Sequence, residues 1–170
     1  MIDVLVFVYE NYWHGEPYPE PLHLKSKLKS VGFDDEEISQ ALHWLDELKL
    51  ATTGLRPEPA GVARQPVVPA HPGYANLAPS PRSMRIYTSG EQDRLGPQCQ
   101  GFIAFLETAG GLPAPLREIV LERVMAAGPG PMSLDDLKVI ILMVYWSLGV
   151  EPDALVLDEL CESTLGRVAH

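Results

Sequence analysis

Two runs of adjacent carboxylates have the residue types that acid–base catalysis or metal binding would use. They are Asp34-Asp35-Glu36-Glu37 and Asp135-Asp136. Paired carboxylates can bind a divalent cation or divide acid–base work between them. Each run, however, stands where a helix is expected to begin, and negative charge is favoured there by the helix dipole. Capping explains both runs, so we assign them neither a metal nor a catalytic role.

The remaining chemistry-bearing residues do not assemble into a known catalytic or metal-binding pattern. The histidines are His14, His23, His43, His71 and His170, and no two have metal-ligand spacing with a third ligand nearby. Cys99 lies near a helix start, where a thiol pKa can fall, but no base accompanies it, which favours a buried structural cysteine. Phosphate-loop, serine-nucleophile and dinucleotide motifs are missing. The sequence therefore predicts no enzyme, no catalytic residues and no cofactor.

Composition narrows the class of protein further. The chain has 170 residues, of which 46% are hydrophobic, and this is enough for one ordinary core or two small ones. Its net charge of -10 repels polyanions at long range unless a local basic patch overrides that field. The longest apolar run, residues 139–146, is far shorter than the ~18 residues that span a bilayer. We expect a cytoplasmic protein without a signal peptide or a membrane segment.

The first half of the chain contains three helical patterns. Residues 2–13 alternate like a strand at first, but the run is long and fits a buried helix better. Leu24 and Leu28 mark a second, amphipathic helix that Gly32 ends. A third helix, capped by Asp34 or Asp35, carries an apolar stripe. That stripe consists of Ile38, Ala41, Leu42, Leu45 and Leu48. The tight turn between the second and third helices predicts a helix-turn-helix.

A short strand is expected after these three helices. Residues 52–81 are rich in proline and show no hydrophobic periodicity, which predicts a long loop. The block Ser83-Met84-Arg85-Ile86-Tyr87-Thr88 then resembles a strand, and Thr88 or Ser89 can cap the helix that follows. The sequence therefore predicts a winged-helix-like domain over residues 1–95, with a short β wing and a wing loop at 52–81.

The second half predicts a helical bundle over residues 96–170, so the fold class is mainly α. Gly96 and Pro97 interrupt the first of its helices, which resumes over residues 98–109. An amphipathic helix follows, with Leu116 and Val120 on its apolar side. Ser133 caps a helix whose residues 137–148 are apolar on almost every side, and this predicts a central position. A last helix is expected over residues 153–165.

Several of these blocks together resemble a known family. They include Gly32-Phe33 with Ala41-Leu42-His43-Trp44-Leu45, the block Ser83-Met84-Arg85-Ile86-Tyr87-Thr88, and Leu134-Asp135-Asp136-Leu137-Lys138. In this combination the chain resembles the Smg family, small uncharacterised proteins of proteobacteria, over nearly its whole length except the proline-rich loop. The resemblance implies no established activity and no accepted catalytic residues.

The outer face of the third helix is the first candidate binding surface. At about 100° per residue, the face opposite the apolar stripe carries Glu36, Gln40, His43 and Glu47. A winged helix presents this face to the major groove of DNA, but two carboxylates would meet phosphates unfavourably. We therefore expect a non-enzymatic regulatory or adaptor module that binds a protein partner. Trp44 on the flank either anchors that partner or packs inside its own chain.

Nucleic-acid binding is the alternative function that the sequence leaves open. Lys25 and Lys29 share one face of the second helix, and Arg82 and Arg85 lie beside the predicted wing. These four side chains are the candidate contacts to DNA or RNA phosphates. A solvated surface and a flexible loop explain the same scattered charges without a ligand.

Overall fold

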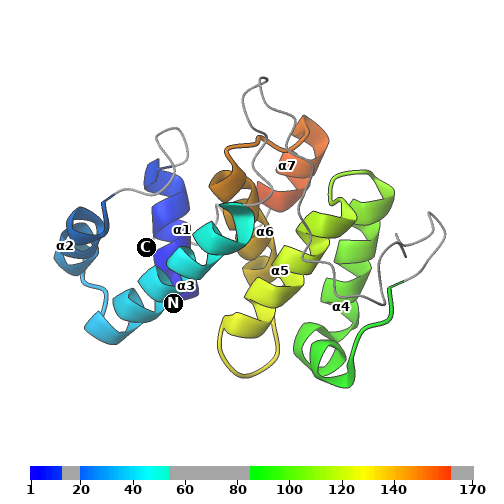
Figure 1. Ribbon diagram of the computed structural model, residues 1–170, viewed down its shortest axis with the longest axis horizontal. Helices are drawn as coiled ribbons and strands as arrows, with labels where there is room; N and C mark the ends of the chain where they lie inside the picture. Colours follow the sequence, from blue (N-terminus) through cyan, green and yellow to red (C-terminus); the bar gives the residue numbers. More distant parts are fainter. Residues whose placement is uncertain (13–19, 54–84, 162–170) are drawn as a thin grey trace, which may run out of the picture.

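The computed structural model describes residues 1–12, 20–53 and 85–161. These residues form seven helices and no strand (Figure 1). The helices are α1 (Ile2–Tyr12), α2 (Pro21–Val31), α3 (Asp35–Thr53), α4 (Ser89–Thr108), α5 (Ala114–Ala126), α6 (Leu134–Leu148) and α7 (Ala154–Cys161). The mainly α prediction is therefore confirmed for the described residues.

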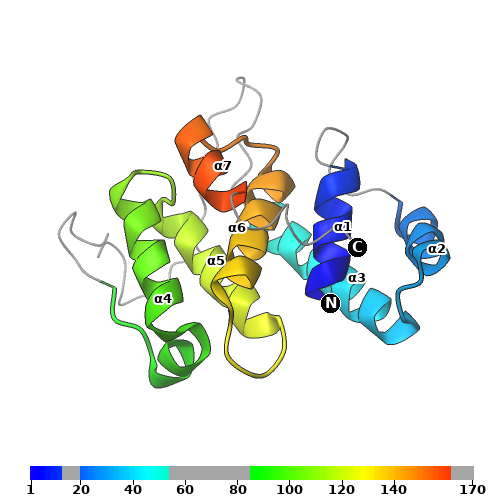
Figure 2. The same cartoon turned by 180° about the vertical axis from the view of Figure 1, so that it is seen from behind.

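Helix α6 lies at the centre of the molecule, as its apolar sequence predicts. Every residue from Leu137 to Leu148 is buried, and α6 packs against α1, α3, α4, α5 and α7 (Figures 1 and 2). The Ser133 hydroxyl accepts the Asp136 backbone N–H at 3.1 Å and so caps the helix start. Gly149 then ends the helix with φ of 66°, a conformation that favours glycine.

The first three helices form as the sequence predicts. Helix α1 is a buried helix rather than a strand, with Val4, Leu5 and Val8 fully enclosed. Proline occupies the start of α2, where its missing N–H leaves no hydrogen bond unmade. Helix α2 packs on α3 at the edge of the molecule (Figure 1). None of the described helices is long and apolar enough to cross a bilayer.

The predicted strand is wrong in the part of the block that the structure describes. Residues 85–88 have no strand partner, and Ile86 is 88% exposed. Side chains hold the segment instead: Arg85 is paired with glutamates of α4 and α5, and Thr88 caps α4 through a reciprocal pair with Glu91. Residues 85–88 are thus fixed to α4 and α5 by side-chain contacts and not by strand pairing. The described residues do not support a winged helix with a β wing. The predicted wing loop lies outside the described residues from position 54 onward.

Contacts cross the predicted domain boundary at residue 95. Helices α1 and α3 pack on α6, and buried apolar residues of both halves belong to one core cluster. Helix α4 spans the boundary, with a kink at Gly96, where φ is 63°, just before Pro97. The division into residues 1–95 and 96–170 as separate domains stays a prediction.

Candidate protein-interaction surface

The turn before α3 sets the direction of the candidate surface. Gly32 ends α2 with φ of 106°, and its N–H bonds to carbonyls of the last turn of α2. The Asp34 carboxylate then accepts the Asp35 backbone N–H at 2.9 Å, and the Ile38 N–H bonds to the Asp34 carbonyl at 3.0 Å. Asp34 therefore starts α3, and the turn chemistry read from the sequence is confirmed.

The outer face of α3 is polar and exposed along its first turns. Glu36, Gln40 and His43 are all exposed, because the helix turns Ile38, Ala41 and Leu45 into the core. The Gln40 amide donates to the Glu36 carboxylate at 3.4 Å. His43 Nε2 lies 3.5 Å from Glu47 Oε1, one turn further along. The stripe thus presents two carboxylates, an amide and an imidazole to solvent on one helix face.

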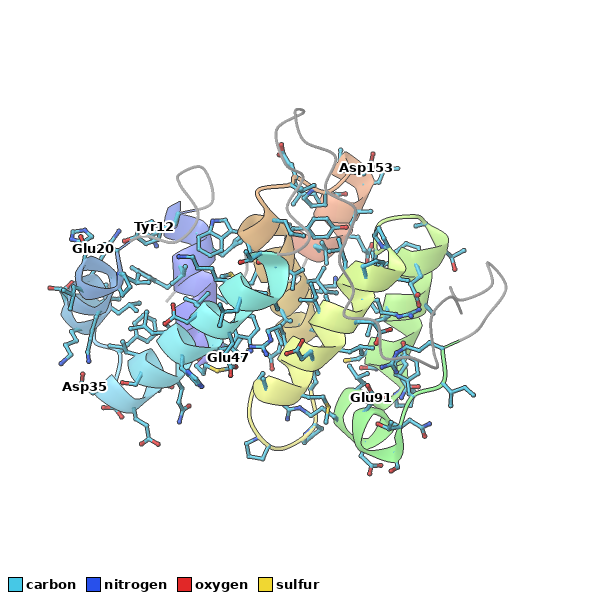
Figure 3. All side chains as sticks on the ribbon, viewed as in Figure 1. Tyr12, Glu20, Asp35, Glu47, Glu91 and Asp153 are labelled. Atoms are coloured by element: carbon cyan, nitrogen blue, oxygen red, sulfur yellow. The ribbon has the colours of Figure 1, made fainter. Side chains whose placement is uncertain are left out.

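Glu47 joins this stripe to α5. Glu47, labelled in Figure 3, accepts through Oε2 a hydrogen bond of 2.8 Å from Nη1 of Arg123, whose side chain is buried. That hydrogen bond lowers the pKa of Glu47 below its ordinary value. Nη2 of Arg123 also pairs with Glu122 at 2.9 Å. Glu47 is therefore a junction between two helices as well as a member of the exposed face.

Trp44 lies inside the molecule, with 2% of its surface exposed. Its indole N–H donates to the Arg123 carbonyl at 3.0 Å, and the Arg123 guanidinium carbon lies 6.0 Å from the ring centre. Of the two roles that the sequence left open, packing within its own chain describes this position. The exposed surface is thus reduced to Glu36, Gln40 and His43, with Glu47 at its edge.

The basic residues of α2 are partly engaged within the molecule. Lys29 Nζ lies 2.6 Å from the Asp35 carboxylate at the start of α3, and this hydrogen bond lowers the pKa of Asp35. Lys25 is half-buried. Lys27 lies over the Tyr12 ring of α1, 5.0 Å from its centre. The two candidate lysines do share a face, but a carboxylate accompanies one of them.

Arg85 is enclosed by carboxylates rather than directed toward a ligand. Its Nη2 lies 2.8 Å from Glu91 Oε1, and its Nε lies 3.0 Å from Glu118 Oε1. The hydrogen bonds that Arg85 donates lower the pKa of Glu91 to about 2, and the same bonds to Glu91 and Glu118 raise the pKa of Arg85. Arg117 extends the network to Glu107 and Glu118. The fourth nucleic-acid candidate, Arg82, lies outside the described residues.

Within the described ranges no group of His, Cys, Asp and Glu side chains is arranged to hold a metal ion. Burial raises the pKa of the Cys99 thiol, which contacts the Met132 carbonyl at 3.4 Å. This is the buried structural position expected for it. Ser133 caps α6 directly before Asp135 and Asp136, as the capping interpretation requires.

Sequence reasoning missed Arg123, which links α3 to α5. The signal was present: Arg123 follows Leu116, Ile119 and Val120 at helical spacing, on the apolar side of its helix. A charged residue on an apolar stripe needs a buried partner or a route to solvent. Its partner lies on another helix, 76 positions away, and no local pattern identifies it.

Comparison with known proteins assigns the family. The whole chain, residues 1–170, matches the family described as "Protein of unknown function (DUF494)". The chain belongs to this family, and the resemblance to Smg proteins is confirmed. A protein of Leptothrix cholodnii named "Protein Smg homolog" is 48% identical over 170 residues, the full length of both chains.

Two further relatives carry the same name. That of Methylibium petroleiphilum is 45% identical over the full length of both chains. That of Herminiimonas arsenicoxydans is 44% identical over 94% of this chain and 92% of its own. No solved structure matches the chain.

Proposed function

We propose that this protein is a non-enzymatic regulatory or adaptor module that binds a protein partner through the outer face of α3. One observation carries the proposal: α3 buries Trp44 and its apolar stripe while directing Glu36, Gln40 and His43 to solvent. Helix α3 packs on α1, α2, α5 and α6, and these contacts restrict the motion of its backbone. The backbone positions from which its outer side chains project are therefore fixed before a partner binds.

Charge indicates the kind of partner. The stripe is acidic, and the chain carries a net charge of -10. A partner with lysine or arginine side chains on its contact surface gains complementarity, which raises the association rate and weakens with salt. Glu47, at the edge of the stripe, contributes less, because Arg123 pairs with one of its oxygens and His43 contacts the other.

Ion pairs that the basic candidates form within the chain argue against the nucleic-acid alternative. Phosphate binding requires cations that are free to replace counterions. Arg85 is paired with two glutamates, and Lys29 with Asp35. Among the described residues, Lys25 is then the one candidate without a recorded ion pair, and it is half-buried. We therefore place the protein partner first.

The test is affinity purification of this protein from its native cell, with two charge-reversal variants compared for the partner that copurifies. Glu36→Lys changes the carboxylate at the first turn of the exposed stripe, whereas Glu10→Lys makes the same charge change on the exposed side of α1. We expect a partner that copurifies with wild type and Glu10→Lys but is reduced at least about tenfold with Glu36→Lys, a difference of ~1.4 kcal/mol. Equal recovery with both variants would remove α3 from the interface.

A further inference from the structure

Arg94 differs from the other arginines of the described ranges. Arg85, Arg117 and Arg123 each pair with two carboxylates. Arg94 is 9% exposed and has no carboxylate partner among the described residues. Its Nε donates to the Val124 carbonyl at 3.3 Å, and Nη1 donates to the Gly130 carbonyl. The guanidinium is therefore buried against neutral acceptors alone.

Neutral carbonyls compensate a buried cation only in part. The Val124 carbonyl belongs to the last turn of α5, where the helix dipole supplies about half a negative charge. The carboxylate that acts on Arg94 through space is Asp136, in the first turn of α6, and burial lowers the pKa of Arg94 in spite of it. Arginine has five N–H groups, and the two contacts leave the others for a further acceptor.

Arg94 is one of the residues that line a surface hollow of about 590 Å³. The others include Gly90, Met125, Ala126, Pro129 and Pro131. The beginning of α4 and the connection from α5 to α6 lie at the same end of the molecule (Figures 1 and 2). Gly128 and Gly130, both with φ of 100°, alternate with the two prolines. Each proline fixes its own φ, which limits the conformations open to this wall.

The geometry points to a binding site for a monocarboxylate that carries an apolar group. The unused N–H groups of Arg94 supply hydrogen bonds to the carboxylate. Met125, which is 46% exposed, and the prolines supply an apolar surface for the attached group. Asp93 also lines the hollow, and its negative charge favours a single carboxylate over a doubly charged phosphate. This site is separate from the stripe on α3.

The test is a titration of the ¹⁵N-labelled full chain with N-acetyl-leucine, followed by NMR. We expect saturable shifts of the Gly90, Gly128 and Gly130 amide signals and of the Arg94 Nε–H signal. N-acetyl-leucinamide, which lacks the negative charge, should bind at least about tenfold more weakly. Absence of saturable shifts, or equal binding of the acid and the amide, would overturn the proposal. So would binding of inorganic phosphate in preference to N-acetyl-leucine.

Substitution of Met125 tests whether the ligand binds in this hollow, and it leaves the hydrogen bonds from Arg94 to Val124 and Gly130 in place. Met125→Glu places an internal carboxylate at the hollow and should weaken N-acetyl-leucine binding at least about tenfold. Met125→Gln, of the same shape but uncharged, should change binding by less than about threefold. Equal effects of the two substitutions would contradict the site.

The titration also distinguishes two sources of the carboxylate. A pentapeptide that ends in leucine is compared with N-acetyl-leucine, and its C-terminally amidated form is the control. Tighter binding of the free-acid peptide would assign the site to a chain terminus, and equal binding would assign it to a small free acid. Equal binding of the peptide and its amidated form would overturn the proposal.

Discussion

Arg123 and Arg94 are two buried guanidinium groups in one chain, and their surroundings differ. Arg123 pairs with Glu47 and Glu122 and lies beside the Trp44 ring. Arg94 contacts two carbonyls and a surface hollow. The first position links α3 to α5, although its buried Nε–H has no hydrogen-bond partner within the part of the chain that the structure describes, while the second has neutral carbonyls as its acceptors. The comparison shows that burial of an arginine does not itself reveal its role, whereas the acceptors around it do.

The largest expected effect comes from replacing each arginine by methionine, which has a similar length but no charge. Arg123→Met should lower the free energy of unfolding by about 2–3 kcal/mol, because hydrogen bonds from a buried charged group are lost. Arg94→Met should lower it by less than about 1 kcal/mol, because removing an uncompensated buried charge offsets the lost hydrogen bonds. Urea unfolding followed by circular dichroism measures both. Equal losses of unfolding free energy in the two variants would show that the acceptors around Arg123 and Arg94 do not distinguish them.

Arg85 is also paired with carboxylates, and its contribution to the free energy of unfolding should depend on pH. The pKa of Glu91 is about 2 in the folded chain, against an ordinary value of 4.5. Its ionised form is therefore the stabilising one: the contribution is complete above about pH 4.5 and disappears as the pH falls toward 2. Glu91→Gln should lower the free energy of unfolding by about 2 kcal/mol at pH 7 and by almost nothing near pH 2.

Unfolding of wild type and Glu91→Gln at pH 7, 5 and 3 provides that measurement. Taking the difference between the two proteins at each pH removes the contribution of the other carboxylates. A difference that stays constant over this range would show that Arg85 does not stabilise the ionised form of Glu91.

The smallest effect concerns the unpaired arginine. Met125→Glu should supply Arg94 with a carboxylate, and that pair should contribute about 0.5 kcal/mol at pH 7, set against the cost of a negative charge in the last turn of α5. The gain is small because Met125 is 46% exposed, so that solvent screens the new pair. Thermal unfolding compares this variant with Met125→Gln. In an Arg94→Met background the contribution of the pair should vanish; if it persists, Arg94 is not its source.

Local patterns predicted the helices because their causes are local. Gly32 ends α2 through its own backbone conformation, and Ser133 caps α6 through a contact three residues away. The strand in the block at residues 83–88 was predicted from residue types that favour strands, but a strand needs a partner. Here Arg85 finds glutamates at positions 91 and 118 instead, and tertiary contacts override the intrinsic preference.

The candidate site was predicted on its exposed side and missed on its buried side. Helical spacing placed Glu36, Gln40 and His43 on one outer face, as observed. The same spacing put Trp44 on the flank but could not say that α5 covers it. Trp44, Glu47 and Arg123 meet only because α3 packs on α5. Arg94 was missed for the same reason, since its acceptors lie 30 and 36 positions away.

The most direct test of protein recognition by the outer face of α3 is photo-crosslinking in the native cell from position 40. A photoreactive amino acid replaces Gln40 on the outer face of α3, and in a matched variant it replaces Ser26, an exposed residue of α2. We expect a discrete protein adduct from position 40 that resists nuclease and is weaker or missing from position 26. A nuclease-sensitive adduct, or equal protein adducts from both positions, would contradict recognition of a protein by this face.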